Sequence, residues 1–358
     1  MAGVKQGKLV HIEILRIMCI FLVMFNHTTP TGYLSFVGAD NTVFYYLSMA
    51  LSVFCKIAVP VFFMISGALL LGKEESIANL LKNRVLKMAI ILFVVSIAYY
   101  VVLNFKDGIS IRGFFRRIYT DAATTALWYL YSYIGFLLML PVLRRLVRMM
   151  RLKEYKYIFF VHVSFSLITA FLDAAFLKAG SANPSLSFSM FLEFNIFFPL
   201  MGYYAENISV SASKPIKKII IALIGMIVSI ILTCLITQIY VLRNDLGTDY
   251  KAYESFFNCL IAVTAVSVYS FVKDTVKIDA SSLLGKTVSQ LGGAVFGVYL
   301  IEKILRMVLS PVYNILAPYI GSFFATIVWV FAGIIFGLVM VCLFRNIPLL
   351  GKYIRKWI

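Results

Sequence analysis

A carboxylate, a guanidinium and an imidazole interrupt one apolar segment near the N-terminus, EILRIMCIFLVMFNH, which covers residues 13–27. The ordinary pKa of histidine is about 6.5, so an uncharged His27 accepts a proton near neutral pH. Arg16 stays protonated and therefore cannot act as a base, but its guanidinium suits paired hydrogen bonds to phosphate. The segment thus combines a proton acceptor with an anion-binding group, and Glu13 precedes both.

Helical geometry puts these side chains on one stripe. Arg16 and His27 are eleven residues apart, which is three turns plus about 20°, and Glu13 falls within about 60° of the same face. The axial distance from Arg16 to His27 is about 16 Å, roughly half the hydrocarbon thickness of a bilayer. Ionisable groups at such depth indicate a functional site, because facing lipid costs each of them at least about 2.5 kcal/mol. The alternative is that Arg16 reaches the interface, Glu13 pairs with it and His27 caps the helix.

The composition shows which kind of element carries this stripe. Of 358 residues, 61% are hydrophobic and 14% are charged, whereas soluble domains are about 25% charged. We therefore predict an all-α, polytopic membrane protein with about ten transmembrane helices, the second of them tilted or broken at Pro60. The predicted spans are residues 10–29, 42–71, 85–104, 124–141, 157–177, 188–205, 217–241, 253–272, 288–309 and 320–344.

The net charge of +17 is distributed like that of a membrane protein and not like that of a nucleic-acid-binding protein. Basic residues gather in alternate connections, which predicts cytoplasmic N- and C-termini. The densest stretch, RRLVRMMRLKEYK at 144–156, is expected to be a cytoplasmic loop that contacts anionic lipids. The external loop at 105–123 also carries basic residues and weakens the pattern there.

Other features indicate a single membrane domain over residues 1–358. The first apolar segment is too long for a cleavable signal peptide and has no small-residue cleavage site. No fused soluble or extracytoplasmic catalytic domain is expected. The five cysteines lie apart in apolar segments without His neighbours at ligand spacing, so we expect no disulfide framework and no metal site.

The segment IEILRIMCIFLVMFNH resembles the first-helix signature of the membrane-integral acyltransferase family three, whose bacterial members O-acetylate envelope polysaccharides and glycolipids. Its mark is an Arg followed by ten residues and a His, here Arg16 and His27, after an acidic residue at the position of Glu13. The family more often has Asp there. Further segments match in order: VPVFFMISGALLL (59–71, with Ser66), LLKNRVLKMAIIL (80–92, with Arg84), ALWYLYSYIGFLLMLPVLR (126–144), FFPLMGYYAE (197–206) and GAVFGVYLIEK (293–303).

This resemblance implies an enzyme that moves an acyl group, expected to be acetyl, from cytoplasmic acyl-coenzyme A to a hydroxyl of an envelope saccharide, glycolipid or other small acceptor. It implies a bacterial cytoplasmic membrane location. His27 would be the general base, with Glu13 as a second catalytic residue. Arg16 would hold a coenzyme A phosphate, since a pantetheine arm is about as long as the distance to His27. The other phosphates would contact Lys82, Arg84 and Lys87.

Four residues are predicted to bind the acceptor: Glu193, Glu302, Trp128 and Ser66. Glu193 is preferred to Asn195, because residues two apart on a helix face about 200° from one another. Glu302 and Arg306 have salt-bridge spacing, and the family often has His at the position of Glu302. The aromatic residues from Trp128 onward fit an interface belt as well as a sugar platform. Residues without motif support are expected to be structural or solvent-facing: Lys56, His162 and Asp173.

GVYLIEK is also similar to the membrane portion of vancomycin-resistance-type serine racemases. The alternative function is therefore a membrane binding or transport module for an amino acid or small solute, held by Glu193, Glu302 and Arg306. That module would not explain the spacing of Arg16 and His27. The expected partners are acyl-coenzyme A, the acceptor and anionic lipids, with a homo-oligomer as a further option and no nucleic acid.

Overall fold

A computed structural model describes residues 9–37, 39–105, 108–176, 178, 179, 181, 183, 194–208, 215–244 and 253–346. Within these ranges every regular element is a helix. Six helical runs are long and apolar enough to cross a membrane: Thr42–Leu70, Ile77–Asn104, Thr125–Met149, Leu152–Ala175, Pro215–Arg243 and Ser322–Arg345. The all-helical, multi-pass prediction is confirmed at this level. The number of ten spans and the sides of the termini stay predictions.

Most helix ends lie within several residues of the ends of the predicted segments. Besides α1 (Val10–Asn26), the helices that fall in the predicted spans are α2 (Thr42–Cys55), α3 (Ala58–Leu70), α5 (Leu86–Asn104), α7 (Trp128–Met149), α8 (Leu152–Ala175), α9 (Phe194–Tyr203), α10 (Pro215–Asn244), α12 (Ile261–Thr275), α13 (Leu283–Val308) and α15 (Ser322–Asn346). Shorter elements are α4 (Ile77–Leu80), α6 (Ile111–Thr120), α14 (Ser310–Ile320), a 3₁₀ turn at Thr125–Leu127 and π-helical turns at Leu81–Val85 and Tyr204–Ile208.

The second predicted span is broken, but not at Pro60. Helix α2 ends at Cys55 and α3 begins at Ala58, with tight turns at Lys56 and Ile57. Pro60 lies in the first turn of α3, where a helix has no partner for the backbone N–H that proline lacks. The break therefore precedes the proline and falls at Lys56, a lysine inside the predicted second span.

The basic stretch at 144–156 is not a loop, which corrects that prediction. It runs through the end of α7, two connecting residues and the start of α8. Arg144 is buried: its Nε donates to the Leu70 carbonyl (3.1 Å), and its Nη2 lies 3.3 Å from Glu75 Oε2. Part of this positive charge thus stabilises helix packing.

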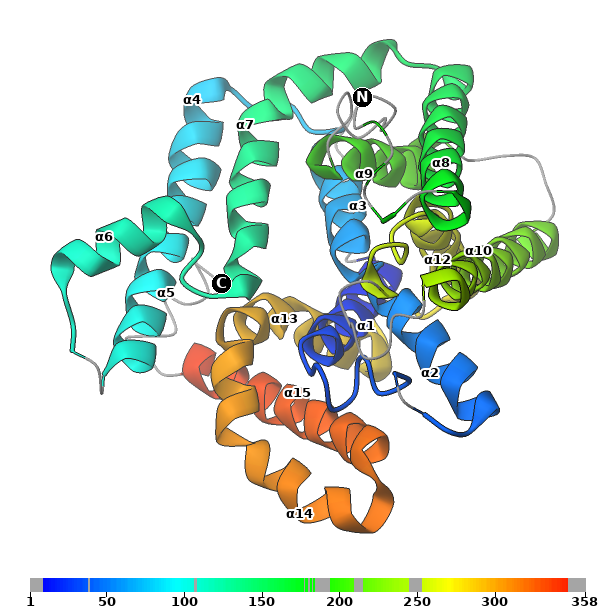
Figure 1. The fold of residues 1–358 in the computed structure, drawn as a ribbon. Helices are drawn as coiled ribbons and strands as arrows, with labels where there is room; N and C mark the ends of the chain where they lie inside the picture. Colours follow the sequence, from blue (N-terminus) through cyan, green and yellow to red (C-terminus); the bar gives the residue numbers. More distant parts are fainter. Residues whose placement is uncertain are drawn as a thin grey trace.

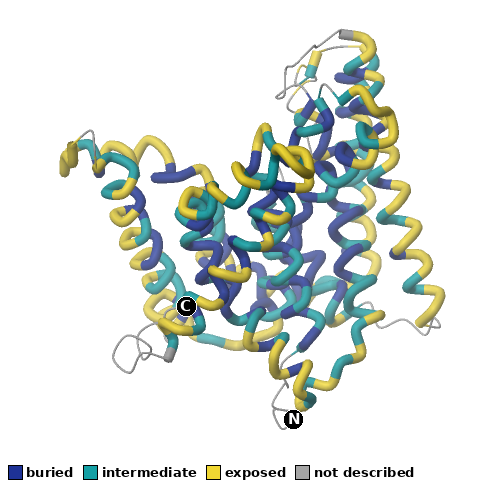
Figure 2. Tube along the Cα trace, turned by 90° about the horizontal axis from the view of Figure 1, so that it is seen from below, coloured by how far each residue is buried: buried dark blue, intermediate teal, exposed yellow. Residues whose placement is uncertain are grey.

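Helix α1 lies in the middle of the molecule, where it contacts α2, α3, α12, α13 and α15 (Figure 1). The buried residues gather in this centre, while the flanking helices are mostly exposed (Figure 2). Gly292 permits a close crossing of α1 and α13, because a Cβ there would stand 2.9 Å from the Glu13 Cα. Many exposed side chains of α5 and α10 are apolar, as lipid-facing helices require.

Candidate active site

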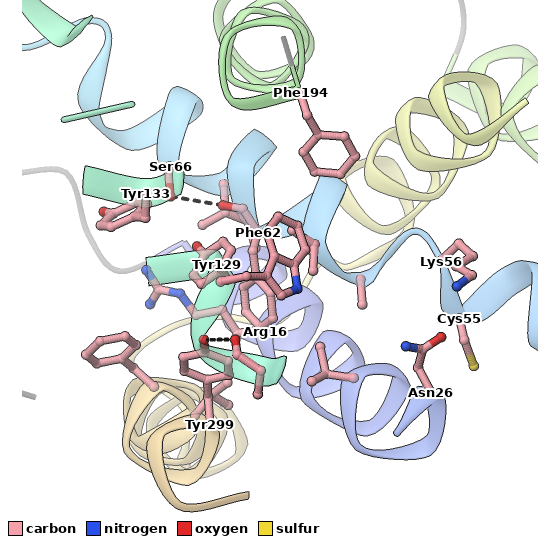
Figure 3. A pocket seen from close by; sticks show the side chains of 18 of the residues that line it. Arg16, Asn26, Cys55, Lys56, Phe62, Ser66, Tyr129, Tyr133, Phe194 and Tyr299 are labelled. Atoms are coloured by element: carbon pink, nitrogen blue, oxygen red, sulfur yellow. Dashed lines mark hydrogen bonds between the residues drawn. The ribbon is translucent and has the colours of Figure 1, made fainter. Parts of the chain in front are cut away.

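A cavity of about 490 Å³ lies against α1, and two of the three residues of the predicted stripe line it. Arg16 and His27 line the same cavity, together with residues of α3, α7 and α13. The predicted common face of these two side chains is therefore confirmed. Predicted acceptor residues Ser66 and Trp128 also line this cavity, and Figure 3 shows Ser66 there.

At one end of the cavity, His27 is held by two residues of α13. Its Nδ1 lies 3.3 Å from Glu302 Oε1, in contact but not aligned for a hydrogen bond. Arg306 donates from Nε to Glu302 Oε2 (2.8 Å) and from Nη1 to the His27 carbonyl oxygen (2.6 Å). The Glu302 side chain is only 1% exposed. The predicted pair of Glu302 and Arg306 is confirmed, and both residues also fix His27.

At the other end, Arg16 is held by a residue of its own helix. Arg16 Nη1 donates to both carboxylate oxygens of Glu13, at 2.8 and 2.9 Å. Glu13 is buried against Gly292 of α13. Fourteen residues separate Glu13 from His27, about 21 Å along the helix axis, so Glu13 acts on Arg16 and not directly on the imidazole.

Aromatic rings form much of the wall between the two ends. Tyr129 stacks on Tyr133 with ring centroids 5.8 Å apart and meets Tyr299 edge-on at 5.7 Å. The Tyr299 hydroxyl donates to the Ala126 carbonyl (2.5 Å), which ties α13 to the turn that precedes α7. The Ser66 hydroxyl donates a hydrogen bond to the Phe62 carbonyl oxygen at 2.9 Å. The wall is thus built mainly from aromatic rings whose contacts join α7 and α13.

The other predicted phosphate-binding residues stand apart from this cavity. Lys82, Arg84 and Lys87 are not among its lining residues in the described chain. Arg84 Nε donates to Glu75 Oε2 at 2.9 Å, and Arg144 contacts the same oxygen. Burial alone would raise the pKa of the Glu75 carboxyl, but hydrogen bonds and charge from the two arginines outweigh it and hold the pKa below its usual range. Arg84 is therefore already paired.

Lys56, which the sequence analysis expects to be structural or solvent-facing, lines the cavity. Its Nζ lies 3.1 Å from Glu254 Oε1 and 5.1 Å from the centroid of the Tyr33 ring. The break between α2 and α3 puts it there, and a lysine in a predicted membrane segment was the available signal. His162 stacks on Phe197 with centroids 3.9 Å apart.

One predicted acceptor residue, Glu193, lies outside the described residues. Its alternative, Asn195, donates weakly to the Ser132 carbonyl at 3.5 Å. In the described chain no group of three or more His, Cys, Asp or Glu side chains could hold a metal ion.

The sequence model of acyltransferase family 3, an acyltransferase domain, matches residues 9–345. The chain belongs to acyltransferase family 3. Comparisons with the curated proteins and with the solved structures give no match. The family match includes Arg16, His27 and Glu302, so both ends of the cavity lie within the acyltransferase domain. Membership of family 3 and the apolar helices together make this chain a multi-pass membrane acyltransferase.

Proposed function

We propose that the protein moves an acyl group, acetyl in the first instance, from cytoplasmic acyl-coenzyme A to a hydroxyl group. The acceptor is an envelope saccharide, a glycolipid or another small molecule, and the reaction takes place at the bacterial cytoplasmic membrane. One observation carries the proposal: a single cavity is lined by both Arg16 and His27. The two residues are about 16 Å apart along α1, about the length of a pantetheine arm. Phosphate held at Arg16 would then put the thioester beside His27.

His27 acts as the general base. Because its Nδ1 lies against Glu302, Nε2 takes the proton of the acceptor hydroxyl. The hydroxyl oxygen attacks the thioester carbonyl carbon, a C–O bond forms and the C–S bond breaks. The leaving thiolate takes the proton back from the imidazolium, which gives an ester and free coenzyme A. Glu302 stabilises the transient positive charge on the ring, and Arg306 keeps Glu302 in place.

Arg16 binds the donor, and Glu13 is its positioning residue. The two hydrogen bonds to Glu13 fix the guanidinium where it can offer its other N–H groups to a phosphate. Arg84, Lys82 and Lys87 supply further positive charge on the same predicted cytoplasmic side. Arg84 can contact phosphate only by sharing its guanidinium with Glu75.

The amino-acid binding or transport module fits these contacts less well. It needs Glu302 to receive a substrate ammonium group. Arg306 and His27 already contact both oxygens of that buried carboxylate. A cationic ligand would have to displace one of them, which is costly for a buried charge.

Purified protein in lipid nanodiscs, given acetyl-labelled acetyl-coenzyme A and an envelope extract, tests the proposal. We expect label to appear in a saccharide or lipid fraction, as an ester that mild base removes, with the wild type and not with His27→Ala. Arg112→Gln, on the remote helix α6, is the matched control and should behave as the wild type. A wild type that binds an amino acid and consumes no thioester would overturn the proposal.

A further inference from the structure

The cavity end that holds His27 also carries polar groups for which the acyl-transfer step has no use. Asn26, Lys56 and Asn258 line it, and Glu254 lies 3.1 Å from the Lys56 ammonium. They come from the end of α1, the break between α2 and α3, and the turns that precede α12. Figure 3 shows Asn26, Cys55 and Lys56 on the side of the pocket opposite Arg16. These four residues, Asn26, Lys56, Glu254 and Asn258, are called the outer polar group below.

Packing alone does not explain the outer polar group. A lysine in a membrane segment has an unfavourable desolvation free energy, and apolar residues would fill the break between α2 and α3 without it. Asn26 Oδ1 is buried and has no hydrogen-bond partner in the described part of the chain. Such an acceptor normally has a donor, and Asn26 also lines the cavity, so its amide is placed to respond to a bound ligand.

The charges and hydrogen-bonding groups point to one class of ligand. Lys56 and Glu254 cancel, so this end presents no net charge. It offers N–H donors from an ammonium and two amides, and acceptors from a carboxylate and two amides. Neighbouring hydroxyls of a sugar ring both donate and accept, which this set matches. The Trp128 ring, 44% exposed, adds an aromatic face at the same cavity.

We infer that the outer polar group is the acceptor subsite and that it selects an uncharged sugar ring through hydroxyls next to the one that is acylated. This inference rests on the proposed function. Asn26 and His27 both line this end of the cavity, so a ring hydroxyl bound by the Asn26 amide leaves its neighbour beside the base. His27 takes the proton of that neighbour, its oxygen forms the C–O bond, and coenzyme A leaves with the proton. An acidic or amino sugar would have to separate Lys56 from Glu254 and leave one charge unpaired.

Transfer of labelled acetyl from acetyl-coenzyme A to three probes tests this selection: methyl glucoside, methyl glucuronide and methyl glucosaminide. We expect the wild type to use the glucoside with a kcat/KM at least about tenfold higher than that of either charged probe, as the loss of one charged hydrogen bond implies. Lys56→Met frees Glu254 and should shift preference to the glucosaminide. Glu254→Gln frees Lys56 and should shift it to the glucuronide.

The double variant, Lys56→Met with Glu254→Gln, keeps the charges balanced. It should again prefer the glucoside, with a raised acceptor KM. In all three variants the acceptor KM should change and the KM for acetyl-coenzyme A should not. An unchanged KM for acetyl-coenzyme A also shows that the variant is correctly folded. Lys153→Met removes an exposed lysine of α8 and is the matched control; it should show wild-type preferences.

Different failures point to different parts of the account. Equal use of all three probes by the wild type would overturn the selection, and so would single variants that keep its preference. A wild type that hydrolyses acetyl-coenzyme A but acylates none of the three probes would overturn the sugar subsite and leave the donor half of the proposed function standing. A wild type that neither hydrolyses nor transfers would remove the proposed function, and the subsite with it.

Discussion

The two ends of the cavity are built in different ways. At one end Glu13 holds Arg16 from three residues away on the same helix. At the other, Glu302 and Arg306 reach His27 from α13, across most of the chain. A local pair forms with the helix itself, whereas the second arrangement exists only once α1 and α13 have packed. The proposed anion-binding end therefore rests on a pair within one helix that packs against α13 at Gly292, whereas the proposed proton-accepting end is built from contacts between two helices.

The largest expected effect is at the proton-accepting end. His27→Ala should lower kcat for acyl transfer by roughly 10²- to 10⁴-fold, because a positioned base is lost. Labelled acetyl transfer measures this, with donor binding as the check on folding. Near wild-type turnover would show that His27 only caps α1, and the His27 end of the cavity would then have no catalytic role that distinguishes it from the Arg16 end.

Glu302→Gln should have the next largest effect, and it tests the contact that crosses the fold. The amide keeps the shape but removes the charge that stabilises the imidazolium and pairs with Arg306. We expect kcat to fall on the order of tenfold to a hundredfold, the range known for carboxylates that orient metal-bound histidines, with reduced thermal stability and unaltered donor KM. If the only defect of this variant were a raised donor KM, Glu302 would act at the Arg16 end of the cavity and not at the His27 end.

Gly292→Ala tests the packing behind the anion-binding end. The new Cβ would stand 2.9 Å from the Glu13 Cα and overlap its side chain, so Glu13 must move. We expect a loss of about 1–3 kcal/mol in the free energy of unfolding and a raised donor KM through Arg16.

The neighbouring substitution, Gly293→Ala, is the control for this prediction. Its Cβ would meet Arg345 Nη1 at 3.8 Å, an ordinary contact. It should change donor KM and the melting temperature much less. Equal effects of the two substitutions would mean that the close crossing at Glu13 does not set the position of Arg16.

The smallest expected effect concerns acid stability at the helix ends near Glu75. Its folded pKa lies below the usual value of 4.5, so its stabilisation is complete above that value and is lost as the pH falls through the folded pKa. Glu75→Gln should therefore destabilise the protein at neutral pH and flatten this part of the acid dependence. Melting temperatures of both proteins from pH 7 to about pH 3 measure it. Parallel curves would show that Glu75 does not titrate with folding.

The difference between the two ends also explains what the sequence could predict. The shared face of Arg16 and His27 follows from helical periodicity, and the pair of Glu302 and Arg306 follows from their spacing. The contact of Glu302 with His27 has no such rule, because helix packing alone brings these residues together. The cavity position of Lys56 depends on where α2 ends, and Pro60 predicted a later break than the one observed.

Short amphipathic and boundary elements were also hard to predict. Helix α6, within the predicted loop at 105–123, and helix α14 are too short to resemble membrane spans. The basic stretch at 144–156 resembles a loop by composition, yet helix continues through most of it because Lys and Arg are good helix formers. Membrane composition thus predicted the long elements, while buried ion pairs such as that of Arg144 and Glu75 required the structure.

The central claim is that donor phosphate binds at Arg16 while the thioester reacts at His27, in one cavity. The most direct test compares acetyl-coenzyme A with acetyl-pantetheine, which lacks the phosphates, on wild type, Arg16→Ala and His27→Ala. We predict that Arg16→Ala raises KM about tenfold or more for acetyl-coenzyme A, as expected for a lost charged contact, and leaves the KM for acetyl-pantetheine unchanged. His27→Ala should lower transfer from both donors by the same roughly 10²- to 10⁴-fold. Equal losses for both donors in Arg16→Ala would contradict the account.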